Sequence, residues 1–222
     1  GPIEIFGPSK VFAQELRIAS PQDQRFRWLV GGFYMHNDRR VNEQLYMPGA
    51  GAVLAPFGFP SDYLFDAHDH ILSSEEALFG EANFDITPQL TLTAGARVFR
   101  NTLHVTDSAD GIFAGGPSHV DRKLEESSTT PKFVLSYKLN PEVMFYAQAA
   151  KGYRIGQTGL APPVDPVSGL PVPSVYGPDS LWNYEGGMKS TLAGGRLTLN
   201  VAAYYIDWTD IQLTQISPLG LS

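Results

Sequence analysis

A short run near position 70 carries the residue types best suited to chemistry. The run DAHDH places Asp66, His68, Asp69 and His70 in one stretch, and imidazole and carboxylate groups are common ligands of divalent metal ions. In an extended strand, His68 and His70 would lie on one side and could share a metal. A stable metal site needs three or four ligands, and the sequence supplies no clear third one. The simpler interpretation is a set of solvated loop residues, so we predict neither a metal site nor a cofactor.

The segment around this run is also rich in aromatic side chains. It extends from residue 37 to 74 and is expected to be a long surface loop. Aromatic rings on a water-facing loop often form a contact surface, although they can equally pack against one another within the loop. The candidate ligand contacts of this segment are Tyr46, Phe57, Phe59, Tyr63, Phe65, Asp66, His68 and His70.

Enzymatic motifs and nucleic-acid signals are missing from the sequence. There is no GxSxG, HExxH, GxGxxG or GxxxxGK[ST] motif, so no catalytic site is predicted. Cysteine is absent, which excludes disulfides and cysteine nucleophiles. The net charge of −7 without a run of Lys or Arg argues against binding to nucleic acid.

Long stretches of the chain alternate between apolar and polar residues. Between positions 25 and 36, for example, Phe26, Trp28, Val30 and Tyr34 share one side, which indicates a β-strand with one apolar face. We expect about eight long strands in a single domain. Their expected positions are 11–20, 25–36, 75–86, 90–106, 123–139, 143–154, 181–192 and 196–213.

The connections between these strands alternate in length. Short connections and long ones follow each other regularly, which places all tight turns on one edge of an antiparallel meander. The short connections are 21–24, 87–89, 140–142 and 194–195, and the long ones are 37–74, 107–121 and 155–180. The fold class is therefore all-β. Strands of this length match a transmembrane barrel, but a soluble β-sandwich or a lipocalin-like barrel also alternates in polarity.

The polar face of the strands carries charges of both signs. Such a mixture suits a water-filled lumen, although it would also suit an ordinary solvated face. The residues expected to face the lumen are Glu15, Arg17, Arg27, Glu81, Arg97, Lys132, Glu185 and Lys189. The mean hydropathy of −0.13 does not argue against a membrane barrel, because its two faces average to a neutral value.

Six segments, taken in order, resemble the barrel region of TonB-dependent outer-membrane receptors. They read QELRIAS, FRWLVGGFY, ALFGEANFDITPQLTLTAGARV, TPKFVLSYKL, FYAQAAKGYRIGQ and WNYEGGMKSTLAGGRLTLNVAAYYIDWTDIQL. The resemblance covers most strands between residues 14 and 213 and leaves the long loops uncovered.

The resemblance implies a barrel of about 22 strands that is closed by an N-terminal plug with a TonB-interacting box. Plug, box and C-terminal strands are not found in this sequence, so the resemblance implies that residues 1–222 are one partial barrel domain, an internal segment of the barrel. Because eight strands could close only a narrow barrel around many charges, we expect an open, curved sheet. Its first and last strands, near Val11 and Ile206, should not pair with each other.

The function implied by the resemblance is energised uptake of a scarce nutrient across the outer membrane of a Gram-negative bacterium. A ferric siderophore or related iron complex is the expected small-molecule ligand. The TonB–ExbB–ExbD complex, acting through the plug, and outer-membrane lipid are the expected partners. A passive porin-like barrel and a soluble lipocalin-like binding protein remain the alternatives, and ligand selectivity is expected in segment 37–74.

One turn can be predicted in detail. Gly194 and Gly195 should be the central residues of a type I′ turn, because both positions of that turn need a positive φ. The turn would pair Met188 with Val201 on the lipid side. It would leave Lys189 on the opposite, lumen side.

Overall fold

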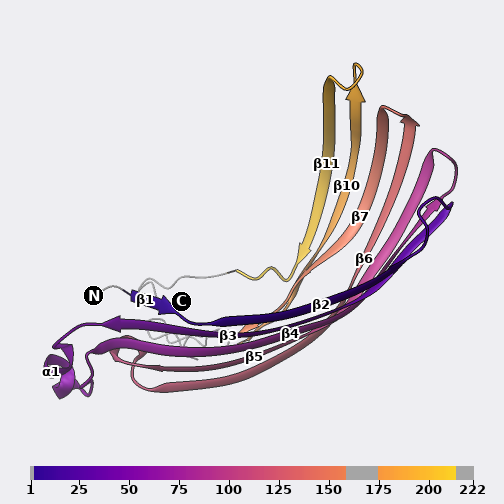
Figure 1. The fold of residues 1–222 in the computed structure, drawn as a ribbon. Coiled ribbons are helices and arrows are strands. Elements are labelled where there is room, and N and C mark those ends of the chain that lie inside the picture. The colour runs from indigo at the N-terminus through magenta and orange to yellow at the C-terminus, as the bar shows by residue number, and fades with distance from the viewer. Residues whose placement is uncertain (1–2, 159–174, 214–222) are drawn as a thin grey trace.

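The computed structural model describes residues 3–158 and 175–213, and these form one curved antiparallel sheet with short additions (Figure 1). The sheet strands are β1 (Ile3–Phe6), β2 (Ser9–Ala19), β3 (Phe26–Tyr46), β4 (Tyr63–Asp85), β5 (Leu90–Asp110), β6 (Ser118–Asn140), β7 (Val143–Arg154), β10 (Asp179–Leu192) and β11 (Leu197–Thr209). The additions are α1 (Ala50–Leu54), the 3-10 helices η1 (Ala55–Phe57) and η2 (Ile112–Ala114), and the small ribbon of β8 (Gln157–Thr158) and β9 (Val175–Tyr176). In the described part of the chain, no helix is long and apolar enough to cross a membrane.

The strands follow each other in chain order across the sheet. β1 and β2 lie end to end along the same edge of β3, separated by Gly7 and Pro8, so the sheet has eight strand positions. The Arg40 amide donates to the Pro8 carbonyl at 2.9 Å, and a Cβ on Gly7 would lie 2.0 Å from the Arg40 carbonyl oxygen. Glycine is therefore required where β1 passes into β2.

The sheet is open. Its order places β2 at one edge and β11 at the other, and no ladder joins them among the described strands. The expectation of an antiparallel meander of about eight long strands that forms an open, curved sheet is therefore confirmed.

One face of the sheet is concave, because side chains from strands two places apart meet on it. Arg17 on β2 lies over the ring of Phe79 on β4 at 5.8 Å, and Lys132 Nζ on β6 reaches Glu81 Oε2 on β4 at 3.0 Å. Such strands are about 10 Å apart at the backbone. The curvature therefore brings their side chains together on this face.

The convex face carries a continuous apolar band. On β3 it extends from Phe26 to Tyr34, which is roughly 30 Å along the strand, and polar residues follow from His36 onward. Its exposed members on the other strands are Leu16, Ile18, Leu78, Phe84, Leu92, Val98, Phe133, Leu135, Tyr137, Phe145, Tyr184, Leu197, Leu199, Val201 and Tyr205.

Two strands, β3 and β4, are much longer than expected, and β5 and β6 are slightly longer. β3 continues to Tyr46 and β4 begins at Tyr63, so most of segment 37–74 is paired strand rather than loop. β5 and β6 likewise extend to Asp110 and from Ser118. The expected boundaries at 36, 75, 106 and 123 were wrong because both faces of these extensions carry polar residues beyond the apolar band, and the alternation that marks a strand disappears there.

The N-terminal part of β6, up to Pro131, separates from β7. The ladder between them ends at Lys132 and Ala150, and the next residue of β6 is Pro131, which has no amide hydrogen to donate. Beyond the end of the ladder, Tyr153 Oη and the Gly156 amide both donate to Glu126 Oε2, at 2.7 and 2.9 Å. A side-chain carboxylate thus replaces the backbone ladder. Much of the third expected loop, 155–180, lies outside the described residues.

The hairpin from β10 to β11 has the predicted register but a different turn. Met188 pairs with Val201, and Lys189 lies over the Tyr146 ring on the opposite face, as predicted. The last pair is Leu192 with Leu197, however, and the Gly195 amide donates to the Leu192 carbonyl at 3.2 Å. The prediction that Gly194 and Gly195 are the central residues was therefore wrong.

The central residues of this turn are instead Ala193 and Gly194, with φ of 54° and 66°. The pairing stops one residue pair earlier than a two-residue loop would require. Gly194 and Gly195 both have the expected positive φ, at 66° and 89°, but Ala193 precedes them as a third left-handed residue.

Ala193 offers a test of this turn geometry. The left-handed conformation costs an alanine about 1 kcal/mol, while glycine adds about 0.5 kcal/mol of unfolded-chain entropy. Ala193→Gly should therefore raise the free energy of unfolding of the complete protein by about 0.5 kcal/mol, measured by urea titration in lipid vesicles. Gly194→Ala should lower it. A destabilising Ala193→Gly would contradict the assigned turn.

Candidate functional site

The eight charged residues expected to face the lumen share one face of the sheet. The strand registers place all of them on the concave side, and they come from β2 to β10. They are Glu15, Arg17, Arg27, Glu81, Arg97, Lys132, Glu185 and Lys189. Their exposure to a water-filled lumen stays a prediction.

Most of these charges have a partner on the same face. Arg17 pairs with Glu15, and Lys132 with Glu81. Arg27 forms a bidentate ion pair with Asp85, at 2.5 and 2.8 Å. A face of paired charges is polar without a strong net charge. It can therefore hydrate or contact a polar surface at modest desolvation cost.

Arg97 is held by two aromatic rings and a carboxylate. Its guanidinium lies over the rings of Phe33 at 5.1 Å and Phe79 at 5.8 Å, and it forms an ion pair with Glu75. Cation–π stacking together with an ion pair restricts the side chain to one geometry. Arg97 therefore serves as a fixed support in the concave wall and is poorly placed to follow a passing ligand.

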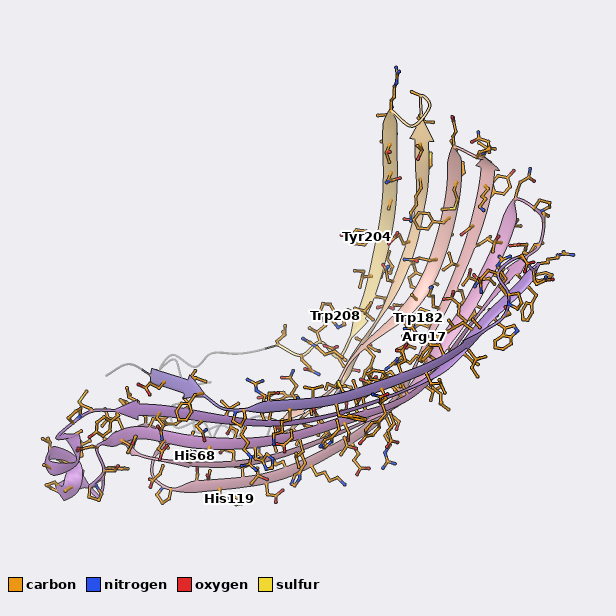
Figure 2. All side chains as sticks on the ribbon, in the orientation of Figure 1. Arg17, His68, His119, Trp182, Tyr204 and Trp208 are labelled. Atoms are coloured by element: carbon orange, nitrogen blue, oxygen red, sulfur yellow. The ribbon has the colours of Figure 1, made fainter. Side chains whose placement is uncertain are left out.

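The structure does not bring the eight candidate ligand contacts together. Asp66, His68 and His70 occupy even positions of β4 and lie on the convex face. Figure 2 shows that His68 and Arg17 lie in different halves of the sheet. His68 bonds Asn42 Oδ1 through Nδ1 at 2.7 Å.

His70 is occupied in the same way, since its Nε2 lies 2.9 Å from Asp38 Oδ1. The described residues contain no group of three or more ligands suited to a metal ion.

The aromatic candidates of the β3–β4 hairpin divide between its connecting loop and the strand ends next to that loop. Tyr46 and Tyr63 form the last strand pair before the loop, and their rings contact each other in a tilted arrangement with centroids 5.0 Å apart. Phe57 is 74% exposed at the tip. Phe59 is half-buried beside it, and Phe65 lies on β4. Tyr46 and Tyr63 are also exposed, at 46% and 38%, so both the tip and the pair next to it present aromatic surface to the medium.

A pair of carboxyl groups on the extensions was missed from the sequence. Asp69 on β4 faces Asp107 on β5 directly, on the concave side and beyond the apolar band. Asp107 is 7% exposed, and Asp69 Oδ1 is buried without a hydrogen-bond partner. Burial, reinforced by Asp107, raises the pKa of Asp69 to about 7. The sequence placed Asp69 in a loop and so gave no indication of its partner.

A second cluster missed from the sequence joins the ends of β7, β10 and β11. The Arg154 guanidinium forms an ion pair with Asp179 and lies 5.7 Å from the centroid of the Trp208 ring. Asp179 is buried, with 3% of its surface exposed. The Gln212 amide donates to Asp179 Oδ2 at 3.2 Å, and its side chain donates to the Ile155 carbonyl at 3.0 Å. This cluster connects the C-terminal ends of β7 and β11 to the N-terminal end of β10.

The architecture defines a class of protein. A curved antiparallel meander with an apolar convex band, a polar concave face and strand extensions on one side is typical of an outer-membrane barrel wall. Residues 7–221 match the family model described as TonB dependent receptor-like, beta-barrel. The chain therefore belongs to this family, whose members are transporters of the Gram-negative outer membrane and not enzymes.

Solved structures agree with the fold. The ferric yersiniabactin uptake receptor FyuA from Yersinia pestis superposes with a TM-score of 0.75 at 17% identity, over 96% of this chain and 31% of the receptor. The ferric-catecholate import receptor Fiu from E. coli K12, in its closed form, gives a TM-score of 0.60 at 13% identity, over 90% of this chain and 31% of that receptor. The chain thus spans about a third of these proteins.

The Asp69–Asp107 pair predicts a local pH dependence. Because the pKa of Asp69 is raised in the folded state, the folded protein holds a proton that the unfolded chain releases, and stability falls as the pH rises toward and through about 7. The backbone amides of β4 and β5 around Asp69 and Asp107 should therefore lose protection from hydrogen exchange between pH 5 and pH 8. Those two values are about two units below and one unit above the raised pKa. The measured rates are corrected for the pH dependence of the intrinsic exchange rate.

The matched variants are Asp69→Asn, which should remove this loss of protection, and Asp66→Asn on the other face of β4, which should keep it. Equal pH dependence in wild type and Asp69→Asn would show that the pair does not share a proton.

Proposed function

We propose that this sheet is part of the wall and outer rim of an outer-membrane transporter that imports a ferric chelate. The observation that carries the proposal is the opposite character of the two faces at the same height. On β3, Phe26 to Tyr34 gives an apolar convex side, while the concave side between the same levels holds Arg27 and the Phe33–Arg97 stack. A lipid-facing exterior and a water-facing interior require this division.

The height of the band supports insertion in a membrane. A transmembrane strand needs about 9–11 residues when tilted by roughly 45°, and the stretch from Phe26 to Tyr34 has this length. A soluble lipocalin-like barrel would have its apolar side on the concave face. Here the most exposed aliphatic residues of the band, Leu16 (73% exposed) and Leu78 (72% exposed), are on the convex side.

The free edges also fit a larger barrel. β2 and β11 each pair on one side only, and unpaired backbone groups are very costly in hydrocarbon. The sheet is therefore continued on both sides by other strands of the barrel. Energy transfer from the TonB–ExbB–ExbD complex would reach the ligand through a plug inside that barrel, and the paired charges of the concave face are suited to contact it.

The ligand class is proposed from two sources. The solved receptors of similar fold take ferric yersiniabactin and ferric catecholates, as their names state. The hairpin from β3 to β4 extends well beyond the apolar band and presents exposed aromatic and aliphatic side chains at its tip, including Phe57 at 74% and Val53 at 70%. Such a tip can make the first contact with a bulky chelate on the cell surface.

Uptake by whole cells tests this function. Cells that express the complete protein should accumulate at least one member of a panel of radioactive iron chelates with phenolate, catecholate or hydroxamate groups. A protonophore should abolish the accumulation. Accumulation that persists after the proton gradient collapses would identify a passive porin-like barrel instead.

The hairpin tip is tested by two sets of serine substitutions. Phe57→Ser with Val53→Ser should lower the initial uptake rate by about tenfold and leave outer-membrane abundance unchanged, because the few side chains that dominate a binding surface each cost more than about 1 kcal/mol when truncated. Tyr46→Ser with Tyr63→Ser removes the ring contact at the last strand pair before the loop and should lower abundance. Undiminished uptake in the tip variant would move the first contact to other loops or to the plug.

A further inference from the structure

An unpaired seam separates β6 from β7 in the outer half of the apolar band. Its edges are residues 127–131 of β6 and 151–154 of β7. The β6–β7 ladder ends at Lys132 and Ala150, whereas β6 still pairs with β5, and β7 with β10, beyond this point. The strand registers place the β6 edge of the seam level with residues 30–34 of β3, so the seam lies within the band. β6 then continues well past the end of β7 (Figure 1).

Pro131 accounts for the start of the seam. The Lys138 amide donates to the Gln89 carbonyl next to β5 at 2.8 Å, so the backbone groups of even-numbered β6 residues face β5 and those of odd-numbered residues face β7. Pro131 has an odd number and no amide hydrogen, and it therefore cannot donate the next ladder bond to β7. Beyond it, the backbone groups of Thr129 and Ser127 also face the seam, where no ladder forms among the described strands.

The side chains on the convex side of the seam are polar, although the neighbouring strands are apolar at the same level. Thr129 is exposed and lies directly beside Val98 of β5. Lys151 pairs with Trp182, which stacks on Tyr184 of the convex band, so Lys151 lies on this face too. A lysine ammonium and unpaired backbone groups are both very costly in hydrocarbon. These groups therefore need contact with water inside the apolar band.

Side chains close the concave side of the seam in place of a ladder. The ring of Tyr153 on β7 packs edge-on against the ring of Phe99 on β5, with centroids 5.0 Å apart. Tyr153 Oη and the Gly156 amide both donate to Glu126 Oε2 on β6, at 2.7 and 2.9 Å. A Cβ at residue 156 would lie 2.5 Å from the Tyr176 carbonyl oxygen, so only glycine allows this approach. Glu126 is thus the acceptor that joins the two edges.

We propose that the seam is a hydrated lateral gate in the barrel wall, and that Glu126 is the latch that keeps it shut. When the bonds from Tyr153 and Gly156 to Glu126 break, the edges of β6 and β7 can separate without the loss of any ladder bond. The paired rows from Lys132 to the β6–β7 turn then act as the hinge. An open gate connects the lumen with the outer leaflet. This inference rests on the proposed function, because it requires the convex face to lie in a membrane.

The way in which the seam is closed favours a gate over a fixed defect in the wall. The ladders on either side, between β5 and β6 and between β7 and β10, are intact at the same level. Separation at either of those places would break several backbone bonds at once. Separation at the seam breaks the bonds to Glu126 and the contact between the rings of Tyr153 and Phe99. The wall is therefore expected to open at the seam before it opens at its neighbours.

Water in the seam can be measured with a matched pair of positions. Thr129 and Val98 are direct partners in the β5–β6 ladder, so they share one face and one depth. Each is replaced in turn by cysteine in the complete protein, which is spin-labelled and reconstituted in lipid vesicles. The label at Thr129→Cys should be more accessible to a water-soluble nickel complex than to oxygen. The label at Val98→Cys should show the reverse.

The latch is tested by the distance between two spin labels, at Val98→Cys on β5 and Tyr184→Cys on β10, in the same vesicles. Tyr153→Phe removes one bond to Glu126 and keeps the ring. It should raise the population with a longer distance about tenfold, which corresponds to 1.4 kcal/mol, since bonds to charged groups are strong. Glu126→Ala removes both bonds and should raise it further. Tyr146→Phe is the matched control, because it removes a similar bond, to Glu185, on the same strand where the ladders are intact.

Two results would overturn the gate. One is an inter-label distance that Tyr153→Phe and Glu126→Ala both leave unchanged, and the other is an equal increase in Tyr146→Phe. The labels also separate this inference from the proposed function. A Val98 label that nickel reaches more readily than oxygen would show that the convex face does not meet lipid and would refute both. Lipid contact at Val98 and Thr129 alike would refute the hydrated seam alone.

Discussion

The fold depends on one constraint, which is that backbone amides and carbonyls in hydrocarbon must bond within the sheet. Across the apolar band the ladders between neighbouring strands from β2 to β11 are continuous except between β6 and β7. That ladder ends at Lys132 and Ala150, in the register row of Leu29 on β3. The Gly7–Pro8 break and the Ala193–Gly194 turn lie beyond the band at its two ends.

Continuous pairing fixes the register, and the register fixes which side chains share a face. A slip of one residue between any two strands would move the whole apolar set of one strand to the concave side. The convex band and the concave ion pairs are therefore consequences of the same set of ladders. Function follows this division, since the concave face can serve a water-filled passage, the convex face can serve lipid, and the extensions form the rim.

The sequence was sufficient to predict the strands within the apolar band, where apolar and polar residues alternate. Within the band, strict alternation predicted the strands, their order and the pairing of Met188 with Val201. Beyond the band it failed, because the extensions of β3 and β4 are held by backbone ladders whose side chains are polar on both faces. Asp69 and Asp107 are far apart in the chain and could be matched only once those extensions were known. The turn failed for a different reason, since two glycines mark a reversal without fixing which residue starts it.

The central claim is that the convex face meets lipid and the concave face meets water, and spin labels can measure this directly. The sequence has no cysteine, so single cysteines can be introduced along β3 from Phe26 to Tyr34 in the complete protein, reconstituted in lipid vesicles. The account predicts a period of two, with even positions accessible to dissolved oxygen and odd positions accessible to a water-soluble nickel complex. The opposite phase, or equal accessibility at all positions, would contradict it.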